Sequence, residues 1–87
     1  MPLKELSPRA TELTPTHITE LERLGYEVPI EAKYIDPYSA ALLQPNRLIE
    51  VDGFFVDQKT GKKYVIGSAY KMRNIFYPNI SEVVAGV

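Results

Sequence analysis

The chain is predicted to fold as a small α+β domain, in which one helix packs across a twisted antiparallel sheet of three to four strands. Two stretches, residues 47–56 and 63–73, are rich in strand-forming residues and flank a turn-forming loop. Residues 15–24 carry apolar side chains at helical spacing. With 87 residues the chain is long enough for one domain. We expect an extended N-terminal arm over residues 1–13, the domain over 14–81 and an apolar C-terminal tail over 82–87.

The N-terminal stretch MPLKELSPRATEL contains two prolines and has no helical or strand period. Proline removes a backbone donor and restricts the residue before it, so this stretch is predicted to be extended. Leu3 and Leu6 are large apolar residues spaced along it. An arm of this kind can lie along the surface of its own chain or of another subunit.

The next stretch, TPTHITELERLG, predicts the longest helix of the chain. Thr14 can cap its first turn, and Pro15 suits the first helical position, where no donor is needed. Gly25 can adopt the left-handed conformation that ends a helix. The apolar stripe of this helix must pack on another element, because about three turns are not stable alone in water.

Residues 26–35, YEVPIEAKYI, alternate between apolar and polar side chains, which predicts a half-buried strand. Pro29 cannot donate to a strand ladder, so this strand is expected at an edge or at a bulge. The following stretch, DPYSAALLQP, predicts a short helix of about two turns that begins after Asp36 and ends before Pro45.

The two strand-like stretches are predicted to form a hairpin around the loop DQKTGKK, residues 57–63. Gly61 fits the position of positive φ in a four-residue loop, and Asp57 can accept hydrogen bonds from the amides of the turn. Unbroken alternation would place Tyr64, Ile66, Tyr70 and Met72 on one, almost wholly apolar face. Gly53 and Gly67, inside the strands, indicate a bulge or the close approach of another backbone.

Several kinds of chemistry are disfavoured by the composition. There is no cysteine and only one histidine, so neither a disulfide nor a typical zinc site is expected, and no cofactor is predicted. A phosphate-binding loop would need glycine at Val56 and a hydroxyl at Lys63. No nucleophile, base and orienting group can be assembled, so the chain is not predicted to be an enzyme or to bind a small-molecule substrate. No signal peptide or membrane span is recognisable, which predicts a soluble protein, intracellular or within a virion.

The leading hypothesis is a non-enzymatic structural or assembly subunit of a multi-copy particle, for example an accessory component of a viral capsid or tail. A small core without cysteine, apolar ends and six tyrosines are typical of a chain that completes its burial on protein neighbours. The candidate partner contacts are Leu3, Leu6, Phe54, Tyr70, Val83, Val84 and Val87.

The alternative is a small nucleic-acid-binding or regulatory module. Residues 58–87 hold five basic side chains against one acidic one, although the whole chain has a net charge of −1. Basic side chains at a hairpin tip can bind phosphate and release counterions. The candidate nucleic-acid contacts are Lys59, Lys62, Lys63, Lys71 and Arg73. A third hypothesis is an adaptor or inhibitor of an enzyme that acts through an edge strand around Pro29.

Overall fold

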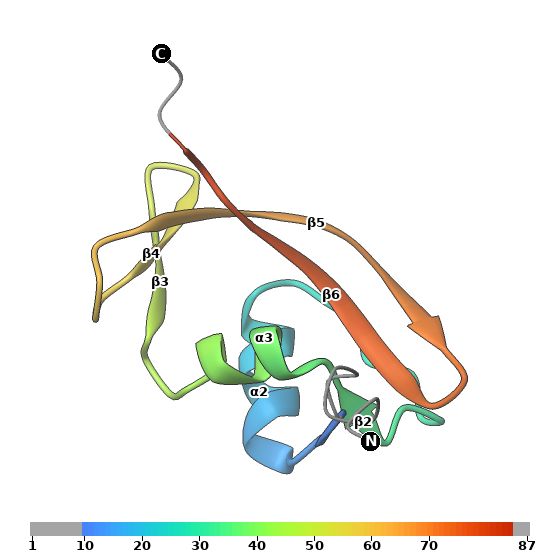
Figure 1. Cartoon of the computed structure of the whole chain (residues 1–87). Coiled ribbons are helices and arrows are strands. Elements are labelled where there is room, and N and C mark those ends of the chain that lie inside the picture. The colour runs from blue at the N-terminus through green and yellow to red at the C-terminus, as the bar shows by residue number, and fades with distance from the viewer. Residues whose placement is uncertain (1–9, 85–87) are drawn as a thin grey trace, which may run out of the picture.

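The computed structural model describes residues 10–84 and shows a six-stranded mixed sheet with two short helices (Figure 1). The strands are β1 (Thr11–Glu12), β2 (Tyr34–Ile35), β3 (Leu48–Val51), β4 (Phe54–Asp57), β5 (Lys63–Met72) and β6 (Ile75–Glu82), in the order β1-β2-β6-β5-β4-β3. Neighbouring strands are antiparallel except β2 and β6, which are parallel. The α+β class is compatible with this architecture. The predicted sheet of three to four strands with one packed helix is wrong.

Helix α2 (Pro15–Arg23) forms where the sequence predicts a helix. The Thr14 hydroxyl accepts a hydrogen bond from the His17 amide, while the Thr14 amide donates to Nδ1 of His17. The side chain of each residue thus accepts a hydrogen bond from the backbone amide of the other. Gly25, with φ of +104°, takes the chain out of the helix. Arg23 donates to the carbonyl oxygen of Leu48 at 2.7 Å, which ties α2 to β3.

Helix α3 (Pro37–Leu42) confirms the second, shorter helix. The carboxylate of Asp36 accepts a hydrogen bond from the Ser39 amide at 3.0 Å, and Pro37 occupies the first turn. The helix ends with Leu42 and Leu43 buried, so its last turn belongs to the core.

The strand predicted over residues 26–35 is wrong except for its last two residues, which form β2. Tyr26 is held at the end of α2, because its amide donates to the carbonyl oxygen of Leu21. Pro29 lies in a turn closed by the Ala32 amide, and Ile30 is 94% exposed. Alternation gives a strand only where another strand pairs with it, and no described strand pairs with residues 26–33. The edge strand proposed around Pro29 is therefore absent from the described residues.

The first strand of the predicted hairpin is two strands. Asp52 and Gly53 both have positive φ, +53° and +83°, and turn the chain back between β3 and β4. An Asp-Gly pair favours this two-residue hairpin because both residues tolerate the left-handed region. Within one unbroken strand, alternation would put Val51 and Phe55 on one face. The turn instead pairs Val51 with Phe54, so Val51 and Phe55 lie on opposite faces.

The loop between β4 and β5 is confirmed as a turn built on Asp57 and Gly61. A carboxylate oxygen of Asp57 accepts a hydrogen bond from the Lys59 amide at 2.8 Å, and Gly61 has φ of +80°. The amide of Asp57 donates to the carbonyl oxygen of Lys62. The aspartate and the glycine thus have a structural role in this loop.

Strands β5 and β6 are joined through a bulge. Their register shifts between Gly67, opposite Asn79, and Tyr70, opposite Tyr77, so Ser68 and Ala69 face Pro78 alone. Pro78 lacks an amide hydrogen, but this costs the ladder no bond, because Asn79 and Tyr77 are the residues of β6 whose backbone groups point toward β5 here. The buried Tyr26 hydroxyl lies 3.0 Å from the carbonyl oxygens of both Gly67 and Asn79 and supplies a donor there. Burial raises the pKa of Tyr26, which keeps this hydroxyl protonated.

The bulge also changes which side chains share a face. Tyr64 lies on the core side with Ile66, whereas Tyr70 and Met72 project from the opposite side. The single apolar face predicted for β5 is therefore wrong, because the extra residue shifts the alternation by one position.

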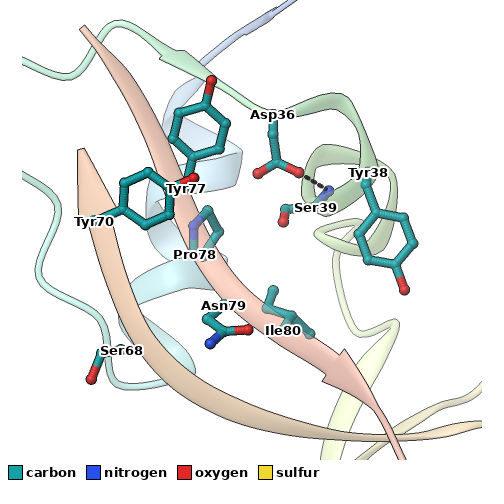
Figure 2. Close-up of a pocket in the computed structure, with 9 residues that line it drawn as sticks. All are labelled: Asp36, Tyr38, Ser39, Ser68, Tyr70, Tyr77, Pro78, Asn79 and Ile80. Atoms are coloured by element: carbon teal, nitrogen blue, oxygen red, sulfur yellow. Dashed lines mark hydrogen bonds between the residues drawn. The ribbon is translucent and has the colours of Figure 1, made fainter. Parts of the chain in front are cut away.

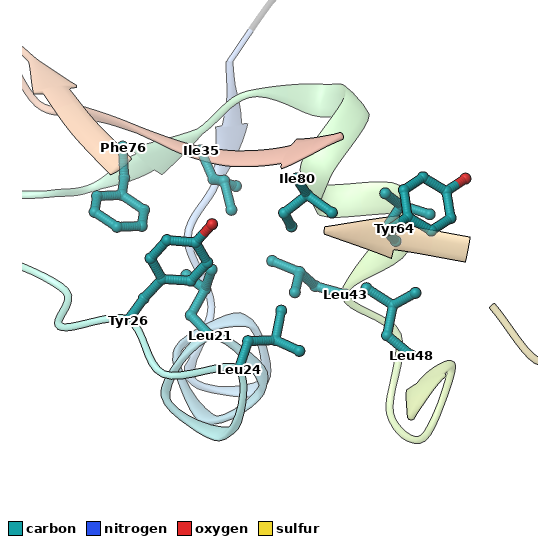
Figure 3. Close-up of a cluster of buried hydrophobic side chains, with 10 residues drawn as sticks. Leu21, Leu24, Tyr26, Ile35, Leu43, Leu48, Tyr64, Phe76 and Ile80 are labelled. Atoms are coloured by element: carbon teal, nitrogen blue, oxygen red, sulfur yellow. The ribbon is translucent and has the colours of Figure 1, made fainter. Parts of the chain in front are cut away.

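The core lies between the helices and the inner face of the sheet, which is the face toward the helices (Figure 3). The ring of Tyr26 packs edge-on against Phe76, with centroids 6.1 Å apart. Each fully buried large apolar side chain contributes about 1.5–3 kcal/mol. The buried apolar residues are Leu21, Leu24, Tyr26, Ile35, Leu42, Leu43, Leu48, Tyr64, Phe76 and Ile80.

One buried ion pair fixes the β3–β4 hairpin. Arg47 donates to both carboxylate oxygens of Asp57, at 3.0 and 2.9 Å, and also to the carbonyl oxygen of Ala41 at the end of α3. Asp57 is fully buried. The hydrogen bond from Arg47 lowers the pKa of Asp57 to about 2, against the opposing effect of burial.

We expect Asp57→Asn to lower the free energy of unfolding by about 2 kcal/mol at neutral pH, since the pKa of Asp57 falls from 3.8 to about 2 on folding. Because the folded pKa is the lower one, this contribution is complete above about pH 4 and is lost as the pH falls toward about 2. Urea unfolding across this pH range measures it. Glu50→Gln, at an exposed position, is the control. If the difference in unfolding free energy between Asp57→Asn and the wild type does not shrink in acid, the lowered pKa of Asp57 is not its cause.

We expect Tyr26→Phe to lower the free energy of unfolding by about 1 kcal/mol, because it removes the hydroxyl that donates to the carbonyl oxygens of Gly67 and Asn79 beside the bulge. Tyr34→Phe is the matched control, since Tyr34 is 39% exposed. Equal unfolding free energies for the two variants would show that the Tyr26 hydroxyl does not support the bulge.

Candidate interaction surface

Both helices lie on the same side of β5 and β6, and no described element covers the other side of the sheet (Figure 1). We call this uncovered side the outer face. An uncovered sheet face is normally polar, so apolar side chains there indicate a binding surface.

Within residues 10–84, nine large apolar side chains are more than a third exposed, and six of them project from the outer face. The strand register places them there, since each lies on the side opposite the core residues of its strand. They are Tyr34, Val51, Val65, Tyr70, Met72 and Val83.

One end of the outer face is aromatic. The rings of Tyr70 and Tyr77 stack across β5 and β6, with centroids 4.8 Å apart and planes 13° from parallel. Met72 and Tyr34 lie on either side of Ile75 in the sheet, and both are exposed. Tyrosine and methionine are enriched at the centres of protein interfaces, so this end has the composition of a protein contact.

The other end of the outer face is aliphatic and lies on β3, β4 and β5. Val51 pairs with Phe54, and the Nζ atom of Lys63 is 5.4 Å from the centroid of the Phe54 ring. Val65 is 40% exposed beside Ser81 of β6. The polar residues Asn79 and Ser81 separate this end from the tyrosines.

A cavity of about 210 Å³ opens beside the aromatic end, between α3 and strands β5 and β6 (Figure 2). Tyr70 and Tyr77 line it from the sheet, while Asp36 and Tyr38 line it from the start of α3. The Oδ1 atom of Asp36 is buried and has no hydrogen-bond partner among the described residues. The cavity therefore extends the aromatic surface around the edge of β6.

The predicted nucleic-acid contacts are divided between the two ends of β5. Lys59, Lys62 and Lys63 belong to the β4–β5 loop and the first residue of β5, whereas Lys71 and Arg73 lie at the β5–β6 turn. A ten-residue strand separates the two groups by roughly 30 Å. Lys62 is 3.9 Å from Glu82, and Lys71 donates to the carbonyl oxygen of Arg73. The five side chains do not form one basic patch.

The predicted partner contacts are partly brought together. Phe54 and Tyr70 lie on the outer face, Val83 donates its amide to Lys63 at the end of the sheet, and Val84 is 76% exposed after it. Leu3, Leu6 and Val87 lie outside the described residues. The outer-face residues that the sequence analysis did not identify are Tyr34, Val51, Val65, Met72 and Tyr77. Two sequence features could have indicated their face: the Asp-Gly pair, which makes a turn, and Gly67 with Pro78, which mark the bulge.

The described residues offer no group of three or more side chains that could hold a metal ion. The single histidine, His17, uses its Nδ1 atom to cap α2. Neither α2 nor α3 has the length and hydrophobicity that crossing a bilayer requires.

Comparison with protein-family models, with curated proteins and with solved structures finds no match to this chain.

Proposed function

We propose that this chain is a non-enzymatic assembly subunit that associates with copies of itself within a multi-copy particle, of which a viral capsid or tail is one example. The observation that carries the proposal is the outer face, where exposed apolar and aromatic side chains gather on one side of the sheet.

The size of the chain supports this function. A domain of this length buries only roughly 60% of the surface that its unfolded chain exposes, so it gains stability from burial on neighbours. Here the helices bury one face of the sheet and leave tyrosine, methionine and valine side chains on the other. A second layer from another copy would bury those side chains without rearranging the core.

We expect the double substitution of Tyr70→Ser with Met72→Ser to weaken self-association by roughly tenfold or more, because it removes the two most exposed apolar side chains of the aromatic end. Light scattering on a sizing column, at several protein concentrations and at low and moderate salt, measures the mass of the wild type and the variant.

Ile30→Ser is the matched control, since Ile30 is 94% exposed but lies in the loop before β2 and in no strand of the sheet. Circular dichroism checks that all three proteins are folded. A wild type that is monomeric at every concentration overturns the proposed function, and so does equal weakening by the control.

A further inference from the structure

The second half of β5 has an open edge. Strand β4 pairs with β5 only at Lys63 and Tyr64, so residues 65–72 have no strand on that side. Apart from the ladder to β6, no backbone–backbone hydrogen bond within residues 10–84 reaches them. Figure 1 shows this part of β5 along the rim of the sheet. Unpaired amides and carbonyls in a row form a template for another strand.

The two outermost strands of the sheet are short. Strand β1 has two residues; β3 has four, and Arg23 of α2 donates to the carbonyl oxygen of its first residue, Leu48. The open part of β5 has eight residues, or about 26 Å of strand, and includes no proline. It is therefore the longest free edge among the described strands.

Two residues of this edge direct their amide and carbonyl groups outward. The Val83 amide donates to the carbonyl oxygen of Lys63, so the backbone groups of Lys63 point toward β6. Because these directions alternate along a strand, the amide and carbonyl of Val65 and Gly67 also point toward β6, and those of Ile66 point away from it. At the other end Met72 and Ile75 form the hydrogen-bonded pair that closes a two-residue turn. The amide and carbonyl of the preceding residue, Lys71, therefore point away from β6.

The edge is complementary to itself. One point, between Ser68 and Ala69, is the centre of the whole open edge. It is the midpoint of the open segment 65–72, of the outward pair Ile66 and Lys71, and of the bulge itself. If two copies pair antiparallel about that point, Ile66 of each copy lies opposite Lys71 of the other, and their outward groups meet in a hydrogen-bonded pair. Val65 then lies opposite Met72, where both strands leave the open edge.

We infer that a second copy of this chain binds at the open edge of β5, with residues 65–72 of the two copies antiparallel about a two-fold axis, so that the two sheets form one continuous sheet. This inference rests on the proposed self-association and specifies one of its contacts. It joins the two outer faces side by side, since Met72 and Val65 both project from that face.

The charges at the two ends of the edge agree with this register. The β3–β4 turn lies where the open edge begins and carries Asp52, whereas the β5–β6 turn lies where the edge ends and carries Arg73. Antiparallel pairing brings the acidic turn of each copy next to the basic turn of the other. Complementary charges of this kind favour one register and orientation.

Cysteine cross-linking tests the register directly, because the chain contains no cysteine. Val65 opposite Met72 is a non-hydrogen-bonded pair, whose Cα atoms lie about 4.5 Å apart, within the range of a disulfide. Val65→Cys protein is mixed with Met72→Cys protein under mild oxidation. We expect a disulfide-linked dimer of the two variants to form at least roughly tenfold faster than a dimer of either variant alone, since equivalent positions would lie about 23 Å apart.

The control mixture pairs Val65→Cys with Ile30→Cys, whose side chain is 94% exposed and lies in the loop between α2 and β2, outside the open edge. Cross-linking no faster than in this control overturns the edge pairing. The proposed function survives that result if the wild type still associates and the Tyr70 and Met72 substitutions still weaken it. A wild type that never associates overturns both.

Removing one outward amide is an independent test. Lys71→Pro deletes the donor on the open edge without removing a bond to β6, whereas Lys71→Ala deletes only the side chain. We expect the proline variant to dimerise at least tenfold more weakly than the alanine variant. Exchange of the turn charges, Asp52→Arg with Arg73→Asp, should restore the affinity that either single change reduces. The pairing is overturned if Lys71→Pro and Lys71→Ala dimerise with equal affinity, or if the double exchange of turn charges does not restore the dimer affinity lost in the single variants.

Discussion

The bulge that sets Ser68 and Ala69 against Pro78 is the constraint on which the rest of the sheet depends. The extra residue in β5 shifts the alternation of side chains along the second half of the strand. Beside the bulge, the Tyr26 hydroxyl donates to the carbonyl oxygens of Gly67 and Asn79, which lie 41 and 53 residues from it in the sequence. One side chain thus fastens the loop after α2 to both long strands and inserts its ring in the core.

The same bulge determines which surface is available for function. By adding one residue to β5 it turns Tyr70 and Met72 away from the helices, while Tyr64 and Ile66 remain on the core side. Tyr70 can then stack on Tyr77. The bulge is also the centre of the open edge, so the outer face and the edge that we propose as contacts both follow from one local irregularity.

The ion pair of Arg47 and Asp57 has the corresponding role at the other end of the sheet. Asp57 orders the turn after β4 through the Lys59 amide and holds Arg47, which in turn reaches the end of α3. The stretch DQKTGKK is therefore explained mainly by its aspartate and glycine, which make a turn. Its lysines remain largely exposed, and Lys63 covers the ring of Phe54.

The sequence by itself determined the features that depend on neighbours within a few residues: both helices with the caps Thr14 and Asp36, and the turn from Asp57 to Gly61. The Asp52-Gly53 turn was readable by the same rules, although the stretch was assigned as one strand. Only the tertiary structure decided that residues 26–33 lack a partner strand, that β2 joins β6, and which face Tyr70 occupies. These depend on hydrogen bonds and packing between distant segments, which local periodicity does not encode.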